Sequence, residues 1–70
     1  MKRAILDALE AQYSADIAKA DATINIYLNN SVGIGEHPQH IEEVDKQVQI
    51  IADAKEKLQI LKEFDNGLAL

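Results

Sequence analysis

The sequence of 70 residues contains no cysteine, no tryptophan, one proline and three glycines. Without cysteine the chain can form neither disulfides nor thiolate metal sites, and it cannot carry out thiol catalysis. No apolar run approaches the roughly 20 residues that a membrane-spanning helix needs. The N-terminus also lacks the uninterrupted apolar segment of a signal peptide. We therefore expect an intracellular protein that resides in the cytoplasm.

Positive charge is also scarce, since twelve acidic side chains stand against seven basic ones and the net charge is −5. The basic residues do not cluster, and Lys2 with Arg3 is the single adjacent pair. An acidic surface repels phosphate backbones and anionic lipid headgroups. The composition thus predicts that neither nucleic acid nor a membrane is a partner.

Residues from about 2 to 30 contain neither glycine nor proline, and their apolar side chains recur in steps of three or four. Placed at about 100° per residue, seven of them form one stripe roughly 80° wide. This spacing predicts a helix over residues 2–30, and its two tyrosines are expected to pack in the core. The stripe consists of Leu6, Leu9, Tyr13, Ile17, Ala20, Ile24 and Tyr27.

A second helix is predicted over residues 38–65, after a loop over residues 31–37 that is rich in asparagine, serine and glycine. Pro38 suits the first turn of this helix, and Asn66-Gly67 is a plausible stop. Lys55 falls where the heptad pattern expects an apolar residue, whereas Ile50, Ile60 and Phe64 lie off the seam and should stay partly exposed. The expected core face consists of Ile41, Val44, Val48, Ile51, Leu58 and Leu61.

Together these patterns predict an all-α fold with a single domain, in which two helices of similar length form an antiparallel hairpin. A hairpin has one internal interface and buries little apolar surface for its length. Small proteins close such a deficit with disulfides, a metal or a partner. Because cysteine is absent, we expect copies of the chain to assemble into a four-helix bundle or a higher helical oligomer.

The first predicted helix carries a second stripe, made of alanines, roughly opposite its large apolar side chains. Alanine is the best helix former, so these residues could be propensity choices on a solvated face. Their strict spacing in steps of three and four favours packing instead, because small side chains let two backbones approach closely. The sequence therefore predicts an interface made of Ala4, Ala8, Ala11, Ala15, Ala18, Ala22 and Ile26.

Candidate chemistry is confined to Glu36, His37, His40 and Glu43, whose side chains could hold zinc or another divalent ion. Their spacing is common by chance, and no third strong ligand is fixed. The sequence shows no nucleophile paired with a base, so we expect neither an enzyme nor a cofactor. The preferred hypothesis is a non-enzymatic interaction or assembly protein. An adaptor or inhibitor that binds another protein through an apolar helix face is the alternative, and a metal-dependent regulator is the third hypothesis.

Residues 26–38 read Ile-Tyr-Leu-Asn-Asn-Ser-Val-Gly-Ile-Gly-Glu-His-Pro and precede an acidic helix. This region, about half of the chain, resembles short uncharacterised helical proteins of marine tailed phages. The Val-Gly-Ile turn is also similar to one in the short coiled-coil chaperone for tail-fibre assembly of large myoviruses, which lacks the Gly-Glu-His-Pro continuation. The resemblance implies a viral protein in the host cytoplasm and transfers no functional residues.

Overall fold

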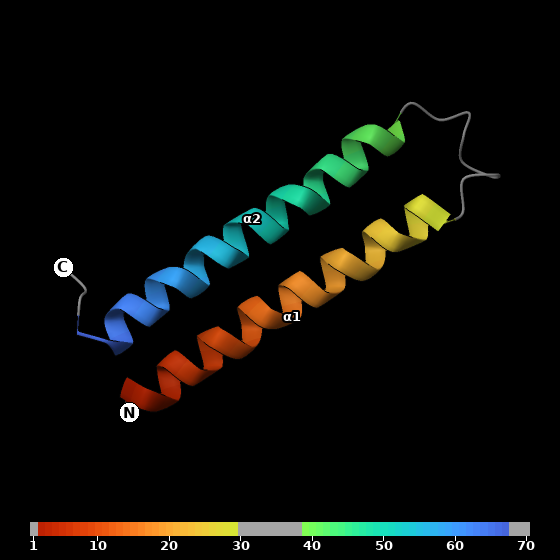
Figure 1. The fold of residues 1–70 in the computed structure, drawn as a ribbon. Helices are drawn as coiled ribbons and strands as arrows, with labels where there is room; N and C mark the ends of the chain where they lie inside the picture. Colours follow the sequence, from red (N-terminus) through yellow and green to blue (C-terminus); the bar gives the residue numbers. More distant parts are fainter. Residues whose placement is uncertain (1, 30–38, 68–70) are drawn as a thin grey trace.

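The computed structural model describes residues 2–29 and 39–67. Within these ranges lie two α-helices, α1 (Lys2–Asn29) and α2 (Gln39–Asp65), and no strand. The helices run side by side in opposite directions, with the beginning of α1 beside the end of α2 (Figure 1). The all-α antiparallel hairpin is thus confirmed. The connection predicted over residues 31–37 lies outside the described residues.

The hairpin is a single layer of two helices and is correspondingly elongated. Its principal extents are 49 × 20 × 13 Å, and its radius of gyration is 15.9 Å. A compact domain of this length would have a radius of gyration of about 11 Å. Because the hairpin is a single layer, each helix packs against the other along one face, and the rest of its surface is open to solvent.

The seam of α1 is the stripe expected from the sequence. All seven of its predicted members are half-buried or buried, including Tyr13 and Tyr27. Two polar residues, Asp16 and Thr23, are also half-buried at the edge of the seam. Spacing in steps of three and four therefore identified the packed face of α1 correctly, because that face is apolar over its whole length.

The seam of α2 differs from the expected one at two of its six members. Ile41 and Val48 are 79% and 50% exposed, so their assignment to the core was wrong. The packed positions between Val44 and Leu61 follow strict steps of three and four, and Gln47 and Ala54 occupy two of them. Lys55 lies outside this series, so it does not interrupt the seam. The residues at the interface are Val44, Gln47, Ile51, Ala54, Leu58 and Leu61.

Small side chains occupy the most buried positions of the hairpin. Ala20 is 0% exposed and Ala54 is 3% exposed, and no large side chain among the described residues is fully buried. A seam built on alanine lets the helix backbones approach closely, but it removes little apolar area from water. The hydrophobic core of a single chain consequently buries little apolar area.

The open end of the hairpin is held by charge and by a helix cap. The Arg3 guanidinium donates hydrogen bonds to Asp7 one turn along α1 and to Asp65 at the end of α2. The N–H of Asn66 bonds to the carbonyl of Lys62 at 2.9 Å, and the N–H of Gly67 bonds to that of Phe64 at 3.2 Å. Gly67 has a φ of 72°, the left-handed conformation of a glycine cap, so the predicted stop is confirmed.

Candidate interaction surface

Large apolar side chains remain in contact with water on several parts of the hairpin. Scattered exposed apolar residues are normal, but contiguous groups mark interaction sites. The arrangement of these residues around the helices therefore matters more than their number. The side chains that are 41–79% exposed are Ile5, Ile26, Leu28, Ile41, Val48, Ile50, Ile60 and Phe64.

Grooves between the helices define two flanks of the hairpin. Two separate grooves lie at opposite ends of the hairpin: Leu28 and Ile41 help to line one, and Glu10 and Lys62 help to line the other. Residues seven apart share an edge of a helix in a heptad pattern. Glu10, Ile17 and Ile24 form such an edge on α1, and Ile41, Val48, Lys55 and Lys62 form one on α2. We call these residues, together with Leu28 beside Ile41 in the groove, the first flank.

The first flank is apolar toward the end where α1 finishes and α2 begins. Tyr27, Leu28, His40, Ile41 and Val44 line a shallow groove there. The rings of Tyr27 and His40 lie 5.6 Å apart between centroids and are tilted by 53°, which packs one aromatic edge against the other. Leu28 is 65% exposed, so the apolar side chains of this groove extend outward into solvent.

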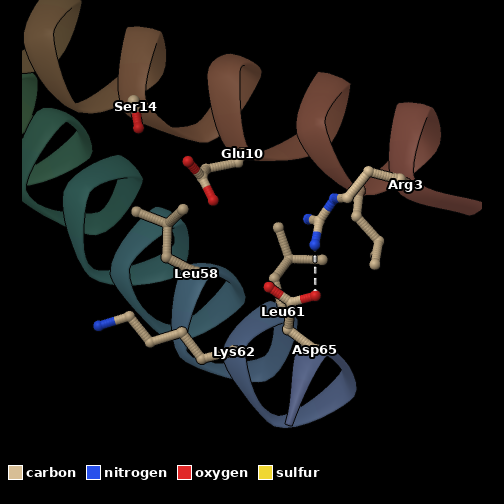
Figure 2. A pocket seen from close by; sticks show the side chains of 8 residues that line it. Arg3, Glu10, Ser14, Leu58, Leu61, Lys62 and Asp65 are labelled. Atoms are coloured by element: carbon tan, nitrogen blue, oxygen red, sulfur yellow. Dashed lines mark hydrogen bonds and ion pairs between the residues drawn. The ribbon is translucent and has the colours of Figure 1, made fainter.

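Toward the opposite end the same flank is charged. Figure 2 shows the residues that line the groove there, with the Arg3 guanidinium reaching across to Asp65 and with Glu10 and Lys62 on opposite helices. The hydrogen bond with Asp65 raises the pKa of Arg3 above its ordinary value. Arg3 therefore keeps its charge and its contacts throughout the neutral range, and this contribution is lost only at strongly alkaline pH.

Three charged side chains of the first flank form no ion pair within the described residues, although Glu10 and Lys62 line the same groove. Within residues 2–29 and 39–67, Glu10, Lys55 and Lys62 take part in no ion pair, whereas Arg3 pairs with Asp7 and Asp65. The unpaired carboxylate belongs to α1, and the two unpaired ammonium groups belong to α2. A surface with this distribution of charge can be complementary to itself.

The other side, called the second flank, carries Ile5, Lys19 and Ile26 of α1 with Ile50, Lys57 and Phe64 of α2. Its groove is polar, because Asp16, Lys19, Thr23 and Gln47 contribute to its lining. The Thr23 hydroxyl donates to the backbone carbonyl of Lys19 at 2.9 Å. The Lys57 ammonium lies 5.3 Å from the centre of the Tyr13 ring, in a cation–π contact. Polar side chains thus cover part of the apolar surface on this flank.

The alanine stripe lies on the outer face of α1, away from the seam. All six alanines are exposed, and Ile26 is 60% exposed. The stripe is therefore free to pack against another helix, although exposure alone is equally consistent with a solvated alanine face. Its role as an interface stays a prediction.

Charged side chains of α2 contact neighbours on their own helix. Lys46 pairs at 3.1 Å with Glu43, and the carboxylate of Asp53 accepts a hydrogen bond from the Gln49 amide at 2.8 Å. The candidate metal ligands Glu36 and His37 lie outside the described residues. In the part of the chain that the structure describes, no three histidine or carboxylate side chains form a group able to hold a metal ion.

No helix in the described ranges is both long and apolar enough to cross a membrane. Comparison with known proteins finds no matching family, no matching curated protein and no matching solved structure. The resemblance to phage proteins and the cytoplasmic location accordingly stay predictions.

Proposed function

We propose that this protein is a non-enzymatic assembly protein that works as a homo-oligomeric helical bundle. The observation that carries the proposal is a contrast within residues 2–29 and 39–67: the buried residues of the seam are Ala20 and Ala54, whereas eight large apolar side chains are exposed. A side chain that is half exposed contributes only part of its hydrophobic free energy to folding. Assembly supplies the remainder by covering these side chains.

The surface area of the chain supports the same proposal. Its accessible surface is 5548 Å², whereas a compact monomer of 7.7 kDa would expose about 4,300 Å². The excess is therefore about 1,200 Å² for each chain. If two copies covered this excess, the interface would total about 2,400 Å², which lies within the range of obligate homodimers. Two hairpins packed together form the four-helix arrangement in which each helix gains a second packed face.

Sedimentation equilibrium over a range of micromolar concentrations tests the proposal directly. We expect a dimer or larger species at micromolar concentration, and thermal unfolding whose midpoint rises with protein concentration, because assembly stabilises the folded state by mass action. A chain that stays monomeric and unfolds at the same temperature at every concentration contradicts self-assembly. That result would favour the alternative role, an adaptor that uses the groove around Leu28 and Ile41 for a helix of another protein.

A further inference from the structure

We propose that two copies dock through the first flank, with α1 of each copy packed along α2 of the other and the two α1 helices pointing in the same direction. This inference rests on the proposed self-assembly and names the interface, its symmetry and the contacts that select it. The two-fold axis of such a dimer runs parallel to the helices. Each contact is consequently present twice.

The contacts within one chain fix which residues of the two helices lie level with each other. Arg3 meets Asp65, and Tyr27 meets His40, so the residue numbers of level partners add up to 68 or 67. Glu10 is therefore level with Leu58, midway between Lys55 and Lys62. By the same rule, Val48 lies level with residues 19 and 20 of α1, between Ile17 and Ile24.

A two-fold axis parallel to the helices keeps these levels when α1 of one copy moves onto α2 of the other. The apolar half of the flank then meets the apolar half of the second copy, so that Val48 lies between Ile17 and Ile24 of the opposite chain. Ile41 likewise lies near Ile24 and Leu28 of the opposite chain. The most exposed apolar side chain, Ile41 at 79%, is thereby removed from water.

The charged half of the flank is complementary in the same arrangement. The level rule places Glu10 between Lys55 and Lys62 of the other copy as well as of its own, so docking gives each carboxylate, which makes no ion pair within one chain, four ammonium neighbours instead of two. Complementary charges at the edges of helical seams set the choice of partner and its orientation. This complementarity is what identifies a second copy, rather than an unrelated protein, as the occupant of the flank.

The opposite arrangement, with the two-fold axis perpendicular to the helices, is disfavoured by the same residues. It places the charged half of one copy over the apolar half of the other. Lys62 would then lie over the apolar side chains around Ile41 of the second copy. Charged groups laid on apolar surface oppose binding.

Substitution of apolar residues tests which face is covered. We expect Ile41→Gln to raise the dimer dissociation constant about 100-fold, because each of two symmetric sites loses about tenfold. Ile26 and Ala15 belong to the interface that the alanine pattern predicts, which competes with the first flank; if the first flank is the interface, Ile26→Gln and Ala15→Gln should change the dissociation constant less than about threefold. Circular dichroism verifies that each variant is still helical. Assembly that survives Ile41→Gln but is lost in either of the other two variants assigns the interface elsewhere and overturns this inference, while self-assembly itself stands.

Exchange of charges tests the orientation. We expect Glu10→Lys alone, and Lys55→Glu with Lys62→Glu alone, each to weaken assembly about tenfold or more at low salt. An equimolar mixture of the two variants should assemble as well as the wild type, since every reversed charge then meets its opposite in the other chain. A mixture no better than its components overturns the proposed docking. A wild-type chain that is monomeric contradicts the proposed function itself, so the two failures are distinct.

Discussion

On the first flank the apolar and charged side chains lie in separate halves, whereas on the second flank they alternate along each helix. Ile17, Ile24, Ile41 and Val48 gather at one end of the first flank, and Glu10 with its two facing lysines gathers at the other. On the second flank, Lys19 lies between Ile5 and Ile26, and Lys57 lies between Ile50 and Phe64. A symmetric partner can match separated halves, but it cannot bury alternating charges without leaving some of them unpaired.

The residues beneath each flank increase this difference. Behind the first flank, the seam presents Leu6, Tyr27, Val44 and Leu58. Behind the second flank it presents polar residues, because Asp16, Thr23 and Gln47 take the seam positions on that side. The second flank exposes more large apolar side chains, but the seam residues beneath it are polar and can hydrogen-bond to water. The order of apolar and charged side chains along a face should therefore predict docking better than the total apolar area of that face.

Replacing the polar residues beneath the second flank should remove the difference between the two flanks. We expect this change to have the largest effect of those considered. In Asp16→Leu with Gln47→Leu, two half-buried polar residues become apolar, which we expect to stabilise the protein by about 2–4 kcal/mol. The second flank then becomes a docking face as well, so the protein should sediment as a species larger than the wild-type assembly. Glu56→Leu with Gln49→Leu, on the outward face of α2, is the matched control. Equal behaviour of the two double variants would show that these polar residues do not protect the second flank.

Substituting one isoleucine on each flank should also distinguish the flanks, with a smaller effect on stability. Ile24 is half-buried on the first flank, and Ile26 is 60% exposed on the second. We expect Ile24→Ala to lower the free energy of unfolding by about 2 kcal/mol, since it removes buried methyl groups from the seam. Ile26→Ala should change it by less than about 0.5 kcal/mol. Urea unfolding of both variants measures the difference, and similar losses would show that the second flank is also covered.

The sequence predicted α1 well because large side chains mark every turn of its seam. It predicted α2 less well, because Val48 is more apolar than Gln47 and was assigned to the core in its place. Steps of three and four from Val44 lead to Gln47 and Ala54, a polar and a small residue that carry little hydrophobic signal. Steps of three and four also lead from Val44 to Val48 and Ile51, so spacing did not separate the two series, and the apolar character of Val48 favoured the wrong residue.

The first flank could not be predicted from the sequence for a related reason. With Ile41 and Val48 assigned to the seam, that edge of α2 retains Lys55 and Lys62 but no large apolar side chain. The level of Glu10 between Lys55 and Lys62 also depends on the pairing of the two helices, which the contacts of Arg3 and Tyr27 provide. In contrast, the alanine stripe and the glycine cap are local patterns that can be recognised from the sequence alone.

The glycine cap at the end of α2 belongs to neither flank. Substitutions there should change the free energy of unfolding by an intermediate amount. A Cβ atom on Gly67 would meet nothing within 4 Å, so strain at a φ of 72° is the main cost of a substitution. We expect Gly67→Ala to lower the free energy of unfolding by about 1 kcal/mol. Gly67→Asn should cost less, because asparagine tolerates the left-handed conformation. Denaturant unfolding measures both variants, and equal stabilities of alanine and glycine at this position would contradict the role of the cap.

The smallest expected effect is the response of assembly to salt, which reports on the charged half of the first flank alone. Raising the ionic strength from about 50 mM to about 500 mM should weaken the dimer several-fold, because exposed charges are screened beyond a few ångströms at high salt. Glu10→Gln removes the carboxylate that lies between Lys55 and Lys62 of the other copy, so its assembly should be weaker at low salt and nearly independent of salt. Asp45→Gln removes an exposed carboxylate of α2 away from those lysines and should keep the salt dependence of the wild type. Sedimentation of the three proteins at both ionic strengths decides the matter. Identical salt dependence in wild type and Glu10→Gln would show that the charged half of the first flank makes no contact between copies, and that apolar side chains alone would have to select the orientation.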